Sequence, residues 1–382
     1  MTTHPHEPVT FGQLPLRIED VLPLANRQAP THLQDDAEYR ERIAKGARFL
    51  DSLLDKEGVI YGVTTGYGDS CVVAVPLEHV EALPRHLYTF HGCGLGKLLD
   101  AQATRAVLAA RLQSLCHGVS GVRVELLERL HAFIAHDVLP LIPEEGSVGA
   151  SGDLTPLSYV AATLAGEREV LFNGERRSSA DVHRELGWTP LVLRPKEALA
   201  LMNGTAVMTG LACLAYARAD YLLKLATRIT ALNVVALQGN PEHFDERLFA
   251  AKPHPGQMQV AAWLRQDLAI DAPTAPLHRL QDRYSLRCAP HVLGVLADSL
   301  NWLRGFIEIE LNSANDNPII DAEEERVLHG GHFYGGHIAF AMDSLKTLVA
   351  NVADLLDRQL ALLVDVRYNH GLPSNLSGAS AE

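Results

Sequence analysis

The 382-residue sequence has little that would connect it to nucleic acids. It contains 33 Lys and Arg against 46 Asp and Glu, so its net charge is −13, and no basic cluster stands out. Binding to a phosphate backbone needs a surplus of Lys and Arg on some face of the protein. The charge balance therefore argues against a nucleic-acid partner and favours small-molecule substrates.

Cysteines are few, odd in number and without a CxxC pair, which argues against a disulfide framework. They are Cys71, Cys93, Cys116, Cys213 and Cys288. The N-terminus, MTTHPHEPVT, has neither a basic start nor an apolar run, so we expect no signal peptide. Residues 198–217 lack charge and match a membrane span in length, but Asn203 and Gly204 interrupt them. We interpret that run as a helix buried in a bundle and expect a cytoplasmic protein without a membrane partner.

Strand signals are scarce, and helical spacing dominates. Between residues 36 and 55, apolar residues such as Tyr39 and Ile43 recur at steps of three and four. Similar patterns cover 77–90, 101–116, 124–136, 196–237, 289–311 and 336–366. One small hairpin is predicted at 168–172, before the turn Asn173-Gly174. The predicted fold class is mainly α, a bundle of long helices with little β structure.

Neither a Pro/Ser-rich linker nor an internal repeat divides the chain, although its length would suit two domains as readily as one. We expect a single domain over 1–382, with a loop-rich portion at 1–195 and a helical bundle at 196–382. Glycine-rich loops lie at 61–68, 91–96, 146–152 and 329–337. Such loops allow close backbone approach and positive φ, which functional sites use.

Three common kinds of site fit these loops poorly. Residues 91–97 match neither GxGxxG nor GxxxxGK[ST], and no strand precedes them. His329, His332 and His337 lack the HExxH spacing and an obvious Cys or carboxylate co-ligand. Ser151 misses the GxSxG pattern because an aspartate stands where the last glycine should be. We therefore expect no metal, no nucleotide and no activated serine nucleophile.

The segment Ala150-Ser151-Gly152 has a chemistry of its own. The amide nitrogen of Gly152 can attack the carbonyl carbon of Ala150 and close a five-membered ring. Only glycine leaves that nitrogen accessible, because no Cβ obstructs the tight backbone geometry. Loss of water from the ring and from the Ser151 side chain leaves an exocyclic methylene, an electrophile made from backbone. The tail repeats Gly-Ala-Ser at 378–380 but follows it with Ala381 instead of glycine.

The stretch ASGDLTPLS, at 150–158, closely resembles the signature of the histidine, phenylalanine and tyrosine ammonia-lyase family. Other segments resemble the same family in the same order: YGVTTG at 61–66, LMNGT at 201–205, QDRYSLR at 281–287, NS at 312–313 and DNP at 316–318. The resemblance runs from about Leu16 to the end. It implies a fumarase/aspartase-like helical fold and elimination of ammonia from an L-amino acid to give a trans-acrylate.

The resemblance also implies a cofactor, 4-methylidene-imidazol-5-one (MIO), formed from Ala150, Ser151 and Gly152, which takes up the substrate amine. Tyr61 matches the family's catalytic base. A phenol is a weak acid, so this role requires a positive environment. A helix that begins near Thr155-Pro156 and points its N-terminus at the site could supply one.

Further roles follow from the resemblance alone. Arg287 matches the carboxylate clamp, for which a bidentate guanidinium is suited. Asn203 and Gln281 match polar groups that hold MIO and the substrate carboxylate. Tyr284 matches a second tyrosine for proton transfer or MIO formation, and Phe333 matches an aromatic residue beside the MIO.

Substrate choice is expected to depend on Phe90-His91. Histidine enzymes of the family resemble Ser-His here, tyrosine enzymes His-Leu and phenylalanine enzymes Phe-Leu, so this pair is a hybrid. Phe90 suits an apolar ring, while His91 can hydrogen-bond a phenol or an imidazole. We predict an aromatic amino acid as substrate, with histidine next.

The sequence departs from the family at three places. Thr64 replaces the usual Asn of YGVNTG, Gln113 stands where Asn is expected, and the family continues well beyond residue 382 with a substrate-facing Glu or Gln. A non-catalytic shortened member and an MIO aminomutase therefore stand as alternatives to the lyase. The family's sites are assembled in tetramers, so 196–238 and 289–311 are the expected core of a homotetramer.

Overall fold

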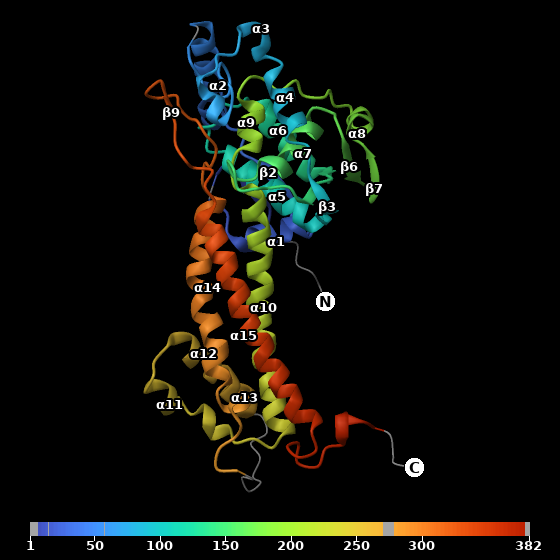
Figure 1. Cartoon of the computed structure of the whole chain (residues 1–382), viewed down its shortest axis with the longest axis vertical. Coiled ribbons are helices and arrows are strands. Elements are labelled where there is room, and N and C mark those ends of the chain that lie inside the picture. Colours follow the sequence, from blue (N-terminus) through green and yellow to red (C-terminus); the bar gives the residue numbers. More distant parts are fainter. Residues whose placement is uncertain (1–6, 14, 57, 270–278, 379–382) are drawn as a thin grey trace. The chain divides into compact units, whose positions relative to one another are not determined.

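The computed structural model describes residues 7–13, 15–56, 58–269 and 279–378 (Figure 1). Two segments named above lie outside this range: residues 1–6 of the N-terminus considered for a signal peptide, and residues 379–381 at the second Gly-Ala-Ser. The described residues form two compact units, one within 1–214 and 307–339 and the other within 215–306 and 340–382. The single-domain organisation with portions at 1–195 and 196–382 stays a prediction.

Two of the longer helices of the first unit, α2 and α5, begin at side-chain caps. Asp36 accepts a hydrogen bond from the Tyr39 amide (3.0 Å) before α2, and Asp100 accepts one from the Ala103 amide (2.7 Å) before α5. The helices wholly within this unit are α1 (Ile18–Ala25), α2 (Ala37–Asp55), α3 (Leu77–Val80), α4 (Leu83–Phe90), α5 (Ala101–Leu115), α6 (Val124–Ala135), α7 (Leu154–Leu164), α8 (Ser179–Glu185) and α9 (Glu197–Met202). The first residues of α10 (Ala206–Ala236) also belong to it. The helices predicted at 36–55, 101–116 and 124–136 are confirmed.

Two predicted helices are each broken in two. The segment 77–90 forms α3 and α4, because Pro84 has no amide hydrogen for an intrahelical bond and begins a new helix. The segment 196–237 breaks between α9 and α10 at Asn203-Gly204, where Gly204 has a φ of +143°. The second break turns the backbone groups of these two residues toward a neighbouring loop.

Short strands join the loops of this unit. The predicted hairpin is confirmed as β6 (Glu169–Phe172) and β7 (Glu175–Ser178), and β4 (Leu139–Pro140) pairs with β6. The other pairs are β1 (Val9–Phe11) parallel to β2 (Thr31–Leu33), β3 (Leu95–Leu98) antiparallel to β5 (Pro143–Glu145), and β8 (Ile319–Asp321) antiparallel to β9 (Arg326–Leu328). Apart from the hairpin, which its Asn-Gly turn indicates, these strands are too short for a readable alternation, and this explains why they were not predicted.

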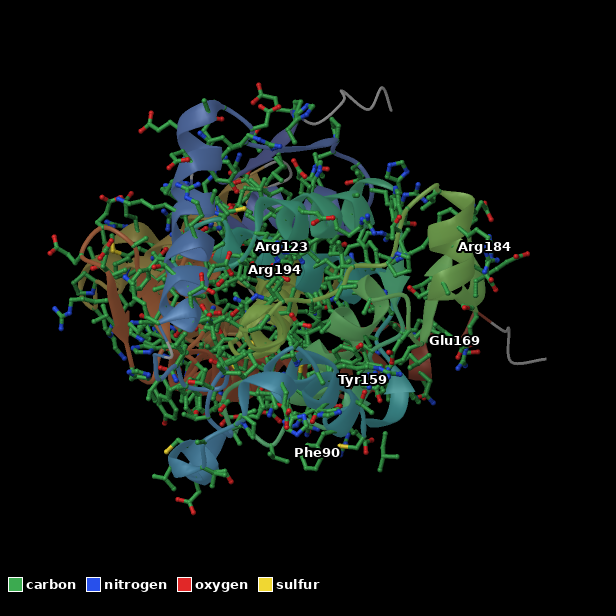
Figure 2. The ribbon with its side chains drawn as sticks, turned by 90° about the horizontal axis from the view of Figure 1, so that it is seen from above. Phe90, Arg123, Tyr159, Glu169, Arg184 and Arg194 are labelled. Atoms are coloured by element: carbon green, nitrogen blue, oxygen red, sulfur yellow. The ribbon has the colours of Figure 1, made fainter. Side chains whose placement is uncertain are left out.

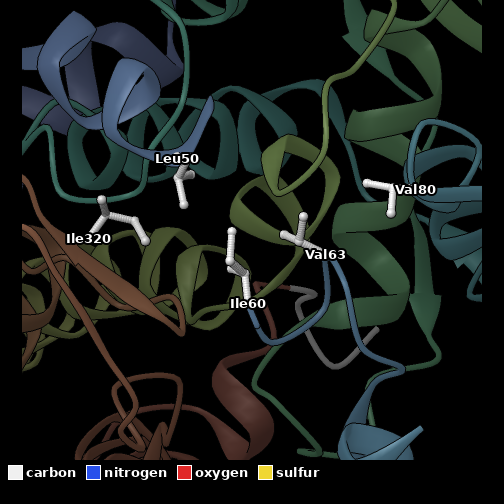
Figure 3. Close-up of a cluster of buried hydrophobic side chains, with 5 residues drawn as sticks. All are labelled: Leu50, Ile60, Val63, Val80 and Ile320. Carbon is white, nitrogen blue, oxygen red and sulfur yellow. The ribbon is translucent and has the colours of Figure 1, made fainter. Parts of the chain in front are cut away.

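A small apolar cluster anchors the loop that carries Tyr61. Leu50, Ile60, Val63, Val80 and Ile320 are all buried together (Figure 3). Ile60 and Val63 flank the loop's first residues, and both are almost completely buried. Burial of side chains on both sides of Tyr61 fixes the start of this loop.

His183, on α8, is buried in an aromatic cluster with Phe133 and Trp188, at ring-centroid distances of 5.7 and 5.8 Å. Burial, assisted by the positive charge of Arg129, lowers the pKa of His183 to about 4. The folded protein therefore favours the neutral imidazole.

We expect this histidine to make the protein less stable in acid. Its contribution is fully present above the unfolded-state pKa of about 6.5 and is lost as the pH falls toward 4, by at most about 3 kcal/mol. Urea unfolding at pH 7, 5 and 4 measures this loss. His183→Phe should reduce the pH dependence by that amount, and an unchanged pH dependence would contradict the assignment.

The regular structure in the described part of the second unit consists of helices, without strands. It holds α11 (Glu246–Ala250), α12 (Pro255–Leu268) and α13 (Tyr284–Arg287), most of α14 (Ala289–Leu311) and α15 (Gly336–Val364), and the larger part of α10. The helices predicted at 289–311 and 336–366 are confirmed. Buried amides tie α10 to α15: Asn233 Nδ2 donates to Gln359 Oε1 at 2.7 Å. None of the described helices is long and apolar enough to cross a membrane.

Candidate active site

The segment Ala150-Ser151-Gly152 lies between β5 and α7 in a strained turn. Ser151 has a φ of +53° and Gly152 of +75°, both in the left-handed region. A Cβ on Gly152 would overlap the carbonyl oxygen of Gly204 and lie 3.0 Å from the carbonyl oxygen of Phe333. Both obstacles are backbone atoms, so glycine is required here. The backbone of Phe333 therefore lies beside the segment, while the role of its aromatic ring stays a prediction.

The break between α9 and α10 holds this turn from the other side. Asn203 Nδ2 donates to the Ser151 carbonyl at 3.0 Å, and the Gly204 amide approaches the same oxygen at 3.3 Å. The Gly204 carbonyl accepts from the Asp153 amide at 2.7 Å. Asn203 therefore lies beside the turn, as its candidate role requires.

Asp153 joins the turn to two helix N-termini. α7 begins at the next residue, Leu154, so the predicted helix start beside the segment is confirmed. The Asp153 carboxylate accepts from the amides of Val207 and Met208, at 2.9 and 3.0 Å, in the first turn of α10. Burial raises the pKa of Asp153 to about 6, although these bonds favour the charged form. Asp153 is thus a carboxylate at neutral pH.

A buried arginine on α5 stabilises the break between α9 and α10. Arg111 Nη1 donates to the Asn203 carbonyl at 3.0 Å, and its Nη2 donates to Ser114 Oγ at 2.8 Å. The Asn317 amide donates to Asn203 Oδ1 at 2.6 Å. Arg111 was missed from the sequence. Its signal is a lone charge between small and apolar neighbours of α5, Ala109, Ala110 and Leu112.

A fully buried ion pair lies next to this network. Lys196 Nζ is 2.5 Å from Asp316 Oδ2, and both side chains have no exposed surface. Ser120 Oγ donates to the other carboxylate oxygen at 2.8 Å. Asp316 directly precedes Asn317, so the Lys196–Asp316 ion pair fixes the backbone segment whose amide binds Asn203.

Tyr61 is held by its own loop. Its hydroxyl oxygen accepts a hydrogen bond from the Gly68 amide at 2.7 Å. Its ring lies edge-on to Tyr67 and His329, at centroid distances of 6.5 and 6.4 Å. Thr64, which replaces the family's Asn, donates to the carbonyl of Gly58, just before the loop, at 3.0 Å.

The loop around His329 connects Tyr61 to the turn. The amide of Gly330 donates to Asn317 Oδ1 at 2.8 Å, and Asn317 in turn binds Asn203. Tyr61 and Ser151 are thus linked through successive contacts.

Among the described residues, no group of three or more His, Cys, Asp or Glu side chains is placed to hold a metal ion.

Phe90 and His91 form the C-terminal end of α4, with Phe90 labelled in Figure 2. The Phe90 ring is 79% exposed and lies edge-on to the His91 ring at 5.1 Å. Burial lowers the pKa of His91, so its neutral form is favoured. The pair presents one apolar ring and one hydrogen-bonding ring.

Three candidate residues belong to the second unit. Gln281 and Tyr284 are both exposed, and the Arg287 guanidinium lies 4.7 Å from the centroid of the Tyr284 ring. Arg287 Nε donates to the Asp282 carbonyl at 3.0 Å. Gln281, Tyr284 and Arg287 therefore lie together around α13 in the second unit. In the first unit, Asn203 and the backbone of Phe333 lie beside the turn 150–152.

Comparison with known proteins gives one family. The family described as aromatic amino acid lyase matches residues 16–382. Histidine ammonia-lyase of Bacillus velezensis is 39% identical over 347 residues, which is 90% of this chain and 68% of that protein. Tyrosine 2,3-aminomutase of Chondromyces crocatus is 39% identical over 386 residues, covering 95% of this chain and 72% of that protein.

Solved structures agree with these matches. The tyrosine aminomutase from Streptomyces globisporus superposes with a TM-score of 0.89 at 36% identity, covering 98% of this chain and 74% of that one. The histidine ammonia-lyase from Trypanosoma cruzi gives a TM-score of 0.85 at 31% identity, covering 96% and 68%.

Proposed function

This chain belongs to the aromatic amino acid lyase family, and on that basis we propose that it eliminates ammonia from an L-aromatic amino acid or L-histidine to give the trans-acrylate. Family membership, the mainly helical fold and the enzyme class of carbon–nitrogen lyase agree with the expectations from the sequence.

The turn at Ala150-Ser151-Gly152 fits the MIO group. The left-handed Ser151 and Gly152 fold the segment tightly, and the absence of a Cβ lets Gly152 lie against the Gly204 carbonyl. Asn203 Nδ2 donates to the Ser151 carbonyl at 3.0 Å, where it would hold the group. When formed, MIO supplies an electrophile for the substrate amine. This geometry is the observation that carries the proposal.

The other candidate residues act on the substrate itself. Tyr61 removes the β-proton as general base, and its oxygen accepts a hydrogen bond from the Gly68 amide. Arg287 binds the substrate carboxylate in a bidentate fashion, with Gln281 as a further donor. Tyr284 carries a proton to or from the reacting groups, and Phe333 packs beside the MIO. These roles are proposals that follow from the family resemblance.

Phe90 and His91 select the substrate side chain. An apolar ring stacks on the Phe90 ring, and the neutral form of His91 can donate to or accept from a phenol or an imidazole. We therefore place an aromatic amino acid first and histidine next. Steady-state kinetics on phenylalanine, tyrosine and histidine rank the three, and a clear preference for histidine would reverse this order.

Intact mass spectrometry of the folded protein tests the cofactor. We expect a mass lower than that of the sequence by two water molecules, because ring closure and loss of the Ser151 hydroxyl each release one. Ser151→Ala has no hydroxyl to lose and should lack at most one water. Ser313→Ala is the matched control: Ser313 is partly exposed, its hydroxyl donates to the Ile309 carbonyl, and this variant should still lose both waters. An unmodified mass in folded wild-type protein would refute the proposal.

A 2,3-aminomutase is the second candidate function, since similar proteins and structures include tyrosine aminomutases. An aminomutase returns the ammonia to the β-carbon. Product analysis separates the two: an acrylate with free ammonia supports the lyase, and a β-amino acid supports the mutase.

Assembly and location complete the proposal. We propose a homotetramer built on the segments 196–238 and 289–311, because their helices carry exposed apolar side chains. These include Leu232, Val235, Val295 and Ile309. We also propose a cytoplasmic enzyme, in keeping with five free cysteines.

A further inference from the structure

Arg168 has a backbone conformation that arginine rarely adopts. It follows the end of α7 with a φ of +63°, in the left-handed region where glycine or asparagine is favoured. Such outliers persist where the surroundings hold them, and they concentrate at functional positions. The contacts of the Arg168 side chain indicate what this conformation serves.

The guanidinium of Arg168 lies between α7 and the loop that follows α4. Its Nη2 donates to the Tyr88 carbonyl at 2.8 Å, in the last turn of α4, where a cation also suits the negative end of the helix. Its Nη1 reaches Ser158 Oγ at 3.3 Å, and the group lies 4.2 Å from the centroid of the Tyr159 ring.

Tyr159 completes the arrangement. Its hydroxyl accepts a hydrogen bond from the Gly94 amide at 3.1 Å (Tyr159 is labelled in Figure 2). Between these two anchors lies Gly92, where an added Cβ would overlap Arg168 Nη2 and lie 2.6 Å from its Cζ. The loop 91–94 therefore lies directly on the guanidinium, and only a residue without a side chain fits there.

Phe90 depends on these anchors for its position. Its ring is 79% exposed, so its own packing does little to fix it. The carbonyl of Tyr88 and the amide of Gly94, which lie on either side of Phe90-His91, are both held by the Arg168–Tyr159 pair. A change in this pair moves the two residues that face the substrate side chain.

We propose that Arg168, with Tyr159, is a positioning residue that sets substrate specificity by clamping the backbone on either side of Phe90 and His91. The inference rests on the proposed function of that site. Arg168 touches no substrate; it acts through the loop. Its removal should alter the discrimination between substrate side chains more than the overall rate.

Arg168→Gly tests the clamp, because glycine accepts the left-handed backbone and removes only the side chain. Arg27→Gly is the matched control: Arg27 also has a positive φ, of +57°, but pairs with Asp137 instead. We expect Arg168→Gly to change the ratio of kcat/KM between the preferred and the second amino acid by about five- to tenfold, and Arg27→Gly to leave it unchanged. Loss of folded protein lowers both rates equally and cannot move this ratio.

A double-mutant cycle tests the contact without any assay of activity. In the wild type, Gly92→Ala should lower the midpoint of urea unfolding, because the new Cβ meets the guanidinium. In Arg168→Gly the same substitution should have little effect, since the space is empty. Additive effects, or an unchanged specificity ratio in an active Arg168→Gly enzyme, would overturn the inference. If the wild type forms no acrylate, the proposed function fails, and its substrate specificity with it. The double-mutant cycle on unfolding still shows whether the Arg168 guanidinium holds the loop 91–94.

Discussion

Gly152→Ala should abolish the two-water mass loss and lower kcat/KM by about three orders of magnitude, equivalent to about 4 kcal/mol of transition-state stabilisation. An alanine at a φ of +75° is strained by about 1–2 kcal/mol. In addition, its Cβ would overlap the Gly204 carbonyl, which accepts a hydrogen bond from the Asp153 amide. Displacing that carbonyl breaks the bond, at a further cost of about 1–3 kcal/mol. Intact mass, acrylate formation and urea unfolding measure the three effects.

Gly149→Ala provides the matched control for this substitution. Gly149 has a nearly identical φ, of +73°, but nothing lies within 4 Å of an added Cβ. We expect the strain alone, a loss of stability of about 1–2 kcal/mol, with the two waters still released. If Gly149→Ala and Gly152→Ala behave alike, backbone strain rather than the contact with Gly204 explains the effect.

The sequence predicts those parts of the fold whose causes are local. Asp36 and Asp100 cap α2 and α5, and the apolar spacing of α2 places Tyr39, Ile43 and Leu50 on its buried face. The segment 150–152, which we propose forms the electrophile, is equally recognisable from the sequence, because its chemistry depends on three adjacent residues. The resemblance to the family added Asn203, whose side chain binds the turn, and Phe333, whose backbone carbonyl lies near Gly152. Their roles stay predictions.

Features that depend on distant partners were not predictable. The break at Asn203-Gly204 looked like continuous helix, because the groups that stabilise it come from Arg111 and Asn317, about a hundred residues away in either direction. Arg168 gave no signal, since its conformation is one that arginine rarely adopts and its main partner is Tyr88. In both cases tertiary contacts override the local preference.

Lys196→Met should destabilise the protein by about 3–5 kcal/mol, because it leaves Asp316 charged, buried and without its partner. The apolar stem of the side chain and the backbone φ of +77° are retained, so the loss of the ammonium group dominates. Lys224→Met removes a pair of nearly equal length, 2.6 Å to Asp220, on the surface. That control should cost less than about 1 kcal/mol. Chemical unfolding of both variants gives the comparison, and equal losses would contradict the role of burial.

The same substitution should also reach the active site. Asp316 precedes Asn317, whose amide donates to Asn203 Oδ1, and Asn203 in turn binds the Ser151 carbonyl. If Asp316 moves toward solvent to be hydrated, Asn317 moves with it, and the hydrogen bond from its amide to Asn203 is weakened. We therefore expect Lys196→Met, but not Lys224→Met, to yield a mixture of masses in which part of the folded protein retains one or both waters. Complete loss of both waters in folded Lys196→Met would show that the turn closes without the ion pair, and that the pair stabilises the fold alone.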